Sequence, residues 1–124
     1  MKAAFHREIT TSALHSRVSP HALEAILRAN LSQDGWVGLL FHPEFHFDGS
    51  RFDAGEAYLS AQHDLARSFL IKGDPLPAWQ AFGRLSHASQ DFYAHSNYVQ
   101  LFLKAYPHSL PAQIDPLLPV ILND

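Results

Sequence analysis

The spacing of apolar residues between proline and glycine breaks most constrains the fold of this chain. Apolar side chains recur every three or four residues along most of it, as on the buried face of a helix. Nothing reads as the apolar–polar alternation that half-buried strands need. The sequence therefore predicts an all-α fold, a compact bundle of about four main helices with one long ordered loop.

Short sequence signals mark where the expected helices begin and end. Ser19 before Pro20 is typical of an N-cap followed by the first helical position. Asp53 and Glu56 have the spacing of a capping box, and Gly73 suits a left-handed C-terminal cap. The expected helices cover residues 4–16, 20–30, 53–72 and 76–104.

Length and charge limit what the chain can be. Its 124 residues indicate one domain, residues 1–124, which ends in a proline-rich tail over residues 106–124. The net charge of −3, with both signs scattered, predicts no nucleic-acid-binding patch. The longest apolar stretch, residues 36–41, is far shorter than the ~20 residues of a membrane span. Because the first fifteen residues show no apolar leader, a cytoplasmic location is expected.

The histidine and cysteine counts decide which metal chemistry is possible. The chain has nine histidines and no cysteine. Disulfides, thiolate zinc sites and iron–sulfur clusters are therefore excluded. Any metal site must be built from nitrogen and oxygen donors.

Three polar residues four positions apart lie on the longest predicted helix. His87 and Asp91 are offset by ~40° and ~6 Å, so their side chains share one face and can hold one ion. His95 lies ~80° and ~12 Å from His87, too far to share an ion with it comfortably on a straight helix. Asp91 can bridge two metals, or a metal and a hydrogen-bond partner. Two core histidines with Asp91 as a local partner remain the alternative.

A second group of donors falls in the loop over residues 30–51. A connection of about 20 residues in a compact domain is usually functional or disordered, and its aromatic residues favour order. His42, His46 and Asp48 follow Asp34 in this loop, and such groups suit zinc ligands and their hydrogen-bond partners. The alternation over residues 45–48 is equally consistent with a half-buried extended segment without a ligand. His6, on the first helix, is a third candidate.

Residues 83–98 resemble a known signature. The run GRLSHASQDFYAHSNY is similar to that of HET-C-type proteins, which resemble in turn the all-α superfamily of zinc-dependent phospholipases C and single-strand nucleases. His6, Asp34 and His46 fall where that resemblance expects a first-helix histidine, a loop aspartate and a loop histidine. The likeness covers most of residues 5–98.

The resemblance implies a metal centre and its ligands. Asp34, His46, His87 and Asp91 would form one site, His6 would contribute to a second, and Asp91 would bridge the two. Because a downstream His-x-x-x-Glu pair is missing, one or two Zn²⁺ ions are expected, and another divalent metal remains possible. The expected metal ligands are His6, Asp34, His46, His87, Asp91 and His95. The residues expected around them, or lining a pocket, are Trp36, His42, Asp48, Gln90 and Asn97.

The function implied is a metal-dependent, phospholipase C-like phosphoester hydrolase. Asp34 and Asp91 would be its catalytic residues, with water activated by the metal centre and a small-molecule or lipid phosphoester as substrate. Two alternatives remain open. The first is an inactive, metal-stabilised HET-C-like interaction or self-recognition module, and the second is a metal enzyme of different chemistry. The sequence predicts no oligomeric state.

Overall fold

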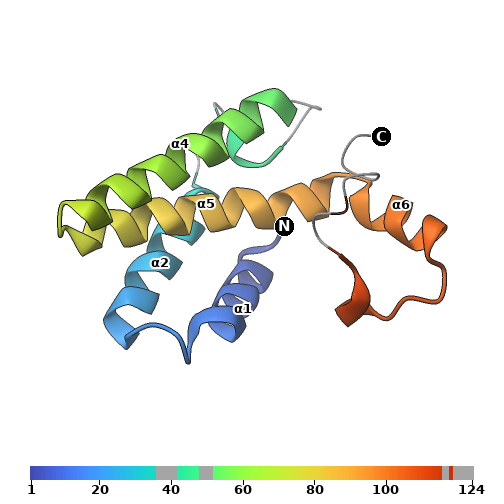
Figure 1. The fold of residues 1–124 in the computed structure, drawn as a ribbon, viewed down its shortest axis with the longest axis horizontal. Coiled ribbons are helices and arrows are strands. Elements are labelled where there is room, and N and C mark those ends of the chain that lie inside the picture. The colour runs from blue at the N-terminus through green and yellow to red at the C-terminus, as the bar shows by residue number, and fades with distance from the viewer. Residues whose placement is uncertain (36–41, 48–51, 116–117, 119–124) are drawn as a thin grey trace.

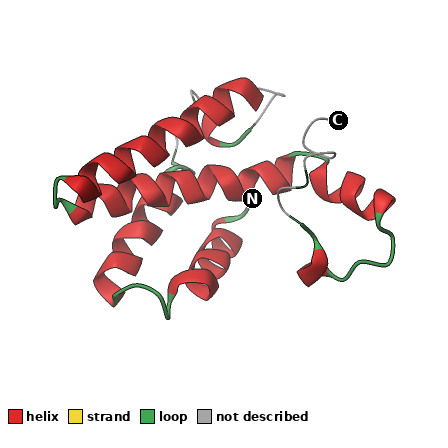
Figure 2. Cartoon of the chain, viewed as in Figure 1, coloured by secondary structure: helices red, strands yellow, loops and turns green. Residues whose placement is uncertain are grey.

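The computed structural model describes residues 1–35, 42–47, 52–115 and 118. Within these ranges the chain is helical and contains no strand, as Figure 2 shows. The predicted all-α fold is therefore confirmed. The elements are α1 (Ala3–Leu14), α2 (Pro20–Ser32), the 3₁₀ turn η1 (Pro43–Phe45), α4 (Phe52–Ile71), α5 (Pro75–His95), α6 (Tyr98–Ala105) and the 3₁₀ turn η3 (Pro111–Gln113).

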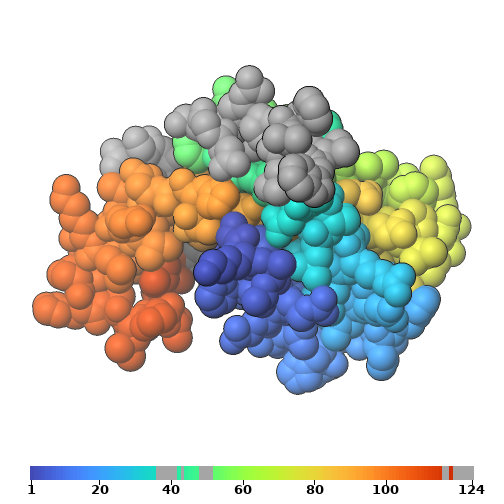
Figure 3. Space-filling model, turned by 180° about the vertical axis from the view of Figure 1, so that it is seen from behind, coloured from blue at the N-terminus to red at the C-terminus, as the bar shows by residue number. Residues whose placement is uncertain are grey.

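Helix α5 is the centre of the bundle. In Figure 1, α4 lies along one side of it, and α1 and α2 lie on the other. Helix α6 continues beyond the end of α5. Seen from behind in Figure 3, α1 (blue) lies between α2 (light blue) and the C-terminal part of the chain (orange). No helix in the described ranges is both long and apolar enough to cross a membrane.

Small residues let α2 and α5 cross closely. A Cβ added at Gly83 of α5 would lie 2.3 Å from the carbonyl oxygen of Ile26 and 2.8 Å from the Cβ of Ala29. Ala29, the α2 residue beside this contact, is itself buried. The side chains on the two facing helices are therefore held at short range, which fixes their relative positions.

Two of the predicted helix boundaries are confirmed. Ser19 Oγ accepts a hydrogen bond from the backbone N–H of Ala22 at 3.2 Å, so Ser19 caps α2 as expected. Gly73 has a φ of 74°, the left-handed conformation predicted for the end of α4.

Other predicted boundaries are wrong. Helix α2 continues to Ser32, two residues past the predicted end. Helix α4 begins at Phe52, so Asp53 lies in its first turn and is not its N-cap.

The single helix expected over residues 76–104 is in fact two, α5 and α6. Ser96 is extended, with φ −93° and ψ 169°, and its hydroxyl accepts a hydrogen bond from the N–H of Tyr98 at 3.3 Å. A serine side chain that bonds nearby backbone in this way competes with the helical hydrogen bonds.

Tyr98 fastens the C-terminal segment to the bundle. Its side chain is buried, and its hydroxyl donates to the backbone carbonyl of Asp115. The N–H of Leu118 donates to the same hydroxyl at 2.9 Å. The proline-rich tail is therefore tied back to the start of α6 at this point.

Candidate metal centre

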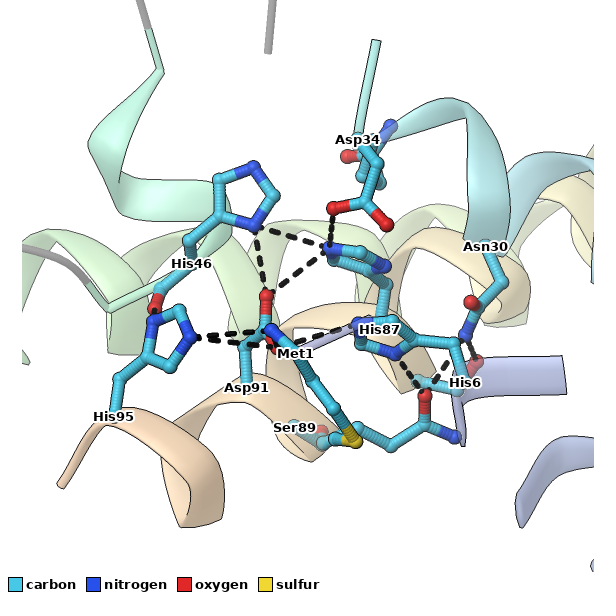
Figure 4. Close-up of polar contacts among 12 residues, drawn as sticks. Met1, His6, Asn30, Asp34, His46, His87, Ser89, Asp91 and His95 are labelled. Atoms are coloured by element: carbon cyan, nitrogen blue, oxygen red, sulfur yellow. Dashed lines mark hydrogen bonds and ion pairs between the residues drawn. The ribbon is translucent and has the colours of Figure 1, made fainter. Parts of the chain in front are cut away.

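The carboxylate of Asp91 is the centre of a buried cluster of histidines. Asp91 lies on α5 with 0% of its side chain exposed. The surrounding groups come from α1, from the end of α2 and from the segment after η1, which are far apart in sequence (Figure 4). Burying a carboxylate is costly unless it is paired or binds a metal.

The Oδ2 atom of Asp91 faces two histidine nitrogens. His46 Nδ1 lies 2.8 Å away and His87 Nε2 lies 3.2 Å away. The two ring nitrogens are 3.1 Å from each other. Asp34 Oδ1 completes the group at 3.7 Å from His87 Nε2.

These distances match those between the ligands of one zinc ion. Zinc–nitrogen bonds of about 2.0–2.1 Å in a tetrahedral site place neighbouring donor atoms about 3.3 Å apart. The three distances among His46 Nδ1, His87 Nε2 and Asp91 Oδ2 are 2.8, 3.1 and 3.2 Å. The donor set therefore fits such an ion.

The other oxygen of Asp91 has a different set of neighbours. His6 Nε2 lies 3.2 Å from Oδ1, and the amino group of Met1 lies 2.8 Å from it. His95 is more distant, with its Nε2 4.0 Å from Oδ1, and its Nδ1 lies 2.8 Å from the backbone carbonyl of His46. Donor atoms of His6, Asp34, His87 and Asp91 all lie within 4.8 Å of one another.

The cluster shifts the pKa values of its members. Burial raises the pKa of Asp91, but hydrogen bonds from the surrounding histidines outweigh burial and hold this pKa far below its ordinary value. Burial lowers the pKa of His6, yet its bonds with Asp91 and Gln90 raise the pKa overall. For His87 burial prevails and the pKa is lowered. The carboxylate is therefore ionised at neutral pH.

Aromatic packing positions His46. Phe45 stacks against Tyr58 of α4, with their ring centroids 4.5 Å apart. Phe47 adopts a φ of 54°, and its ring would lie 2.5 Å from a Cβ added at Gly55. A bare glycine on α4 therefore lets Phe47 dock closely, which holds His46 over Asp91.

Some residues around the cluster had not been predicted. Gln90, which had been expected there, contacts His6 and Thr10, and Asn30 contacts Gln90 and Ser86. Thr10, Asn30 and Ser86 were missed by the sequence reasoning. A usable signal existed, because Thr10 follows His6 by four residues and so falls on the same buried helix face.

Other expected residues lie elsewhere. His42 is half-exposed and contacts Glu44 at 2.8 Å and the ring of Phe45, and no contact with a donor of the cluster is found for it among the described residues. Asn97 is exposed at the start of α6 and is not part of the cluster. Trp36 and Asp48 lie outside the described residues.

Comparison with known proteins decides the family. Residues 2–113 match the family model of the VWA7 N-terminal domain. The chain belongs to this family. It is similar to von Willebrand factor A domain-containing protein 7 of Rattus norvegicus, with 36% identity over 103 residues, which are 80% of this chain and 11% of the relative. The human protein of the same name is 37% identical over 93 residues, which are 72% of this chain and 10% of the relative.

The chain thus spans about a tenth of the length of the VWA7 relatives that it matches. No solved structure matches it.

Membership of the VWA7 N-terminal domain family corrects the resemblance drawn from residues 83–98. The assignment to HET-C-type proteins and to the phospholipase C and nuclease superfamily is wrong, because the family and the curated relatives are VWA7 proteins. The phosphoester hydrolase function inferred from that assignment is wrong for the same reason. Histidine and aspartate four residues apart bring metal donors together on any helix, so this spacing does not identify a family. Enzymatic activity, zinc as cofactor and a cytoplasmic location stay predictions.

Proposed function

We propose that this VWA7 N-terminal domain binds a divalent transition-metal ion, zinc in the first instance, at the cluster around Asp91. The observation that carries the proposal is the triangle of His46 Nδ1, His87 Nε2 and Asp91 Oδ2, with sides of 2.8 to 3.2 Å. Asp34 is the fourth ligand in this proposal, at 3.7 Å from His87 Nε2.

The donor types favour zinc over the hard cations. Magnesium and calcium prefer oxygen ligands, whereas two imidazole nitrogens with carboxylates suit zinc and its neighbours in the first transition row. Charge agrees with this choice, because two ionised carboxylates and two neutral imidazoles carry a charge of −2. A divalent cation neutralises that charge in a place where most of the donors are buried.

The proposed role of the ion is to join separate parts of the chain. Asp34 follows the end of α2, His46 follows η1, and both His87 and Asp91 lie on α5. A metal ligated by all four connects these segments at one point. Since such a site forms only when the chain is folded, the free energy of metal binding adds to the stability of the fold.

The test is the metal content of the protein purified without chelator. We expect at least one zinc per chain by plasma mass spectrometry, and loss of that zinc in Asp91→Asn. Asp64→Asn is the matched control, because Asp64 also lies beside a histidine, His63 at 3.3 Å, but both side chains are exposed. A wild-type protein that holds no metal, and whose melting temperature a chelator leaves unchanged, would overturn the proposal.

A further inference from the structure

A chain of partly buried hydrogen bonds leads to His6 from the side opposite the metal donors. It runs from the backbone carbonyl of Gly83 through Ser86, Asn30 and Gln90 to His6 Nδ1. His6 and Asn30 have 0% exposure, and Ser86 and Gln90 are half-buried. The direction of each bond can be worked out from the chemistry of its groups.

The first two bonds fix the orientation of the Asn30 amide. A carbonyl oxygen only accepts, so Ser86 Oγ donates its proton to Gly83 O at 2.9 Å. Ser86 Oγ then has only lone pairs left for Asn30, 3.0 Å away. The group of Asn30 that faces it must therefore be the amide Nδ2, which donates.

The next two bonds fix the proton on His6. Asn30 Nδ2 also faces Gln90 Oε1 at 3.3 Å, so the Gln90 amide presents its oxygen on this side, and its Nε2 donates to Thr10 Oγ1 at 2.9 Å. The same Gln90 oxygen lies 2.6 Å from His6 Nδ1. Two acceptors cannot approach so closely without a proton between them, so His6 Nδ1 carries the proton.

This assignment leaves the other ring nitrogen of His6 facing a carboxylate. With one proton fixed on Nδ1, Nε2 is the ring nitrogen that is left to bind a metal. His6 Nε2 is buried 3.2 Å from Asp91 Oδ1. Donor atoms of His6, Asp34, His87 and Asp91 lie within 4.8 Å of one another, so Nε2 is placed to reach an ion held at this carboxylate.

We infer that Gln90 is a positioning residue, which holds a proton on His6 Nδ1 and thereby leaves Nε2 as the ring nitrogen that binds a metal ion at Asp91. The inference rests on the proposed function and extends it from the four proposed ligands to His6 and to Gln90, which positions His6. Partners that fix the ring of a metal-binding histidine change metal affinity by about 10- to 100-fold.

Zinc affinity of three variants tests the positioning role. Gln90→Leu removes the acceptor and should weaken zinc binding about 10- to 100-fold in competition with a chromogenic chelator. Gln90→Glu keeps an oxygen that accepts the hydrogen bond from His6 Nδ1. Its zinc affinity should therefore stay within about threefold of the wild-type value. In a His6→Ala background, Gln90→Leu should have little further effect, because the residue on which it acts is gone. Unchanged affinity in Gln90→Leu, or an equal loss in both backgrounds, would overturn the inference.

A second readout does not depend on zinc. Long-range ¹H–¹⁵N spectra of the metal-free wild-type protein should show His6 Nδ1 protonated, and Gln90→Leu should shift the neutral ring toward the Nε2–H form, since Asp91 is then the acceptor that remains. An unprotonated His6 Nδ1 in the wild type would overturn the inference even if zinc binds. A wild-type protein that binds no zinc but has Nδ1 protonated would overturn the proposed function and the metal part of this inference, while the assigned tautomer stands.

Discussion

At the scale of single residues, Asp91 is the group on which the rest of the centre depends. Each of its oxygens has nitrogen neighbours at 2.8 to 3.2 Å, and the side chain is fully buried. A buried charge is tolerated only when other groups compensate it. In the metal-free protein histidines provide that compensation, and in the proposed zinc form the ion takes over part of it.

Removing the charge of Asp91 should destabilise even the metal-free domain. Asp91→Asn leaves the buried histidines without their common acceptor, and breaking a buried pair in this way costs about 3–5 kcal/mol. Urea denaturation in the presence of a chelator measures the loss. Asp64→Asn, on the surface, should stay within about 0.5 kcal/mol of the wild type. Equal stabilities for the two variants would show that Asp91 has no special role in the fold.

The lowered pKa of Asp91 predicts acid sensitivity of the metal-free domain. An unfolded aspartate has a pKa of about 3.9, and the folded value is lower, so below about pH 5 the unfolded chain takes up the proton first. The contribution of Asp91 to stability is therefore complete above that range and is lost as the pH falls. The urea midpoint should decrease between pH 6 and pH 3, and Asp91→Asn should flatten this decrease. An equally steep decrease in both proteins would contradict the view that Asp91 causes the acid sensitivity.

The residues of the centre differ in how far the sequence could predict them. His87 and Asp91 share a helix face, so their proximity follows from helix geometry alone. His6, Asp34 and His46 were candidates from their donor types, and only a family resemblance that is wrong grouped them around Asp91. The structure nevertheless brings His6 and His46 to the carboxylate of Asp91, and Asp34 to His87 beside it. The bonds of Gln90 to residues 60 to 84 positions away could not be predicted, because they depend on how α1 and α2 pack on α5.

At the scale of helices, the close crossing of α2 and α5 sets the geometry of the centre. Gly83 and Ala29 let α2 approach α5 closely, and Asn30 and Asp34 lie in and just after the last turn of α2, next to the cluster. The sequence predicted helices at these places from apolar periodicity. It did not predict the break between α5 and α6, because Ser96 and Asn97 are neither proline nor glycine.

Gly83→Ala should therefore damage both the fold and the metal site. The new methyl would lie 2.3 Å from the carbonyl oxygen of Ile26, and overpacking of this kind costs about 1–3 kcal/mol. Because α2 must move, zinc affinity should fall as well. Gly73→Ala is the control. Apart from its chain neighbours, no atom of the described residues lies within 4 Å of the new methyl. The φ of 74° costs about 1 kcal/mol, and zinc affinity should not change. Equal zinc affinities for Gly83→Ala and the wild type would contradict the role given to this crossing.

At the scale of the whole molecule, the domain combines close helix packing with one buried polar centre, the cluster around Asp91. The VWA7 family membership covers residues 2–113, which include all the described donors of the cluster. Within the described residues, His46 precedes α4, and α1 makes fewer contacts with α5 than α2 does. To the aromatic packing that already holds His46, a metal ion at Asp91 would add a link between the segment of His46, α2 and α5.

Removing zinc should therefore lower the thermal stability of the domain reversibly. With free zinc about a hundredfold above its dissociation constant, binding adds about 2.7 kcal/mol, which for a domain of this size is roughly 10 °C in melting temperature. Circular dichroism melts with chelator, and again after zinc is restored, measure the change. A Tm that is the same in both conditions would contradict a stabilising role for the ion.

The most direct measurement of the central claim is X-ray absorption at the zinc edge of the loaded protein. The account predicts nitrogen and oxygen ligands at about 2.0–2.1 Å, with the outer-shell scattering of at least two imidazole rings, and loss of this signal in Asp91→Asn. A zinc ion surrounded by oxygen alone, without imidazole scattering, or one that is unaffected by Asp91→Asn, would contradict it.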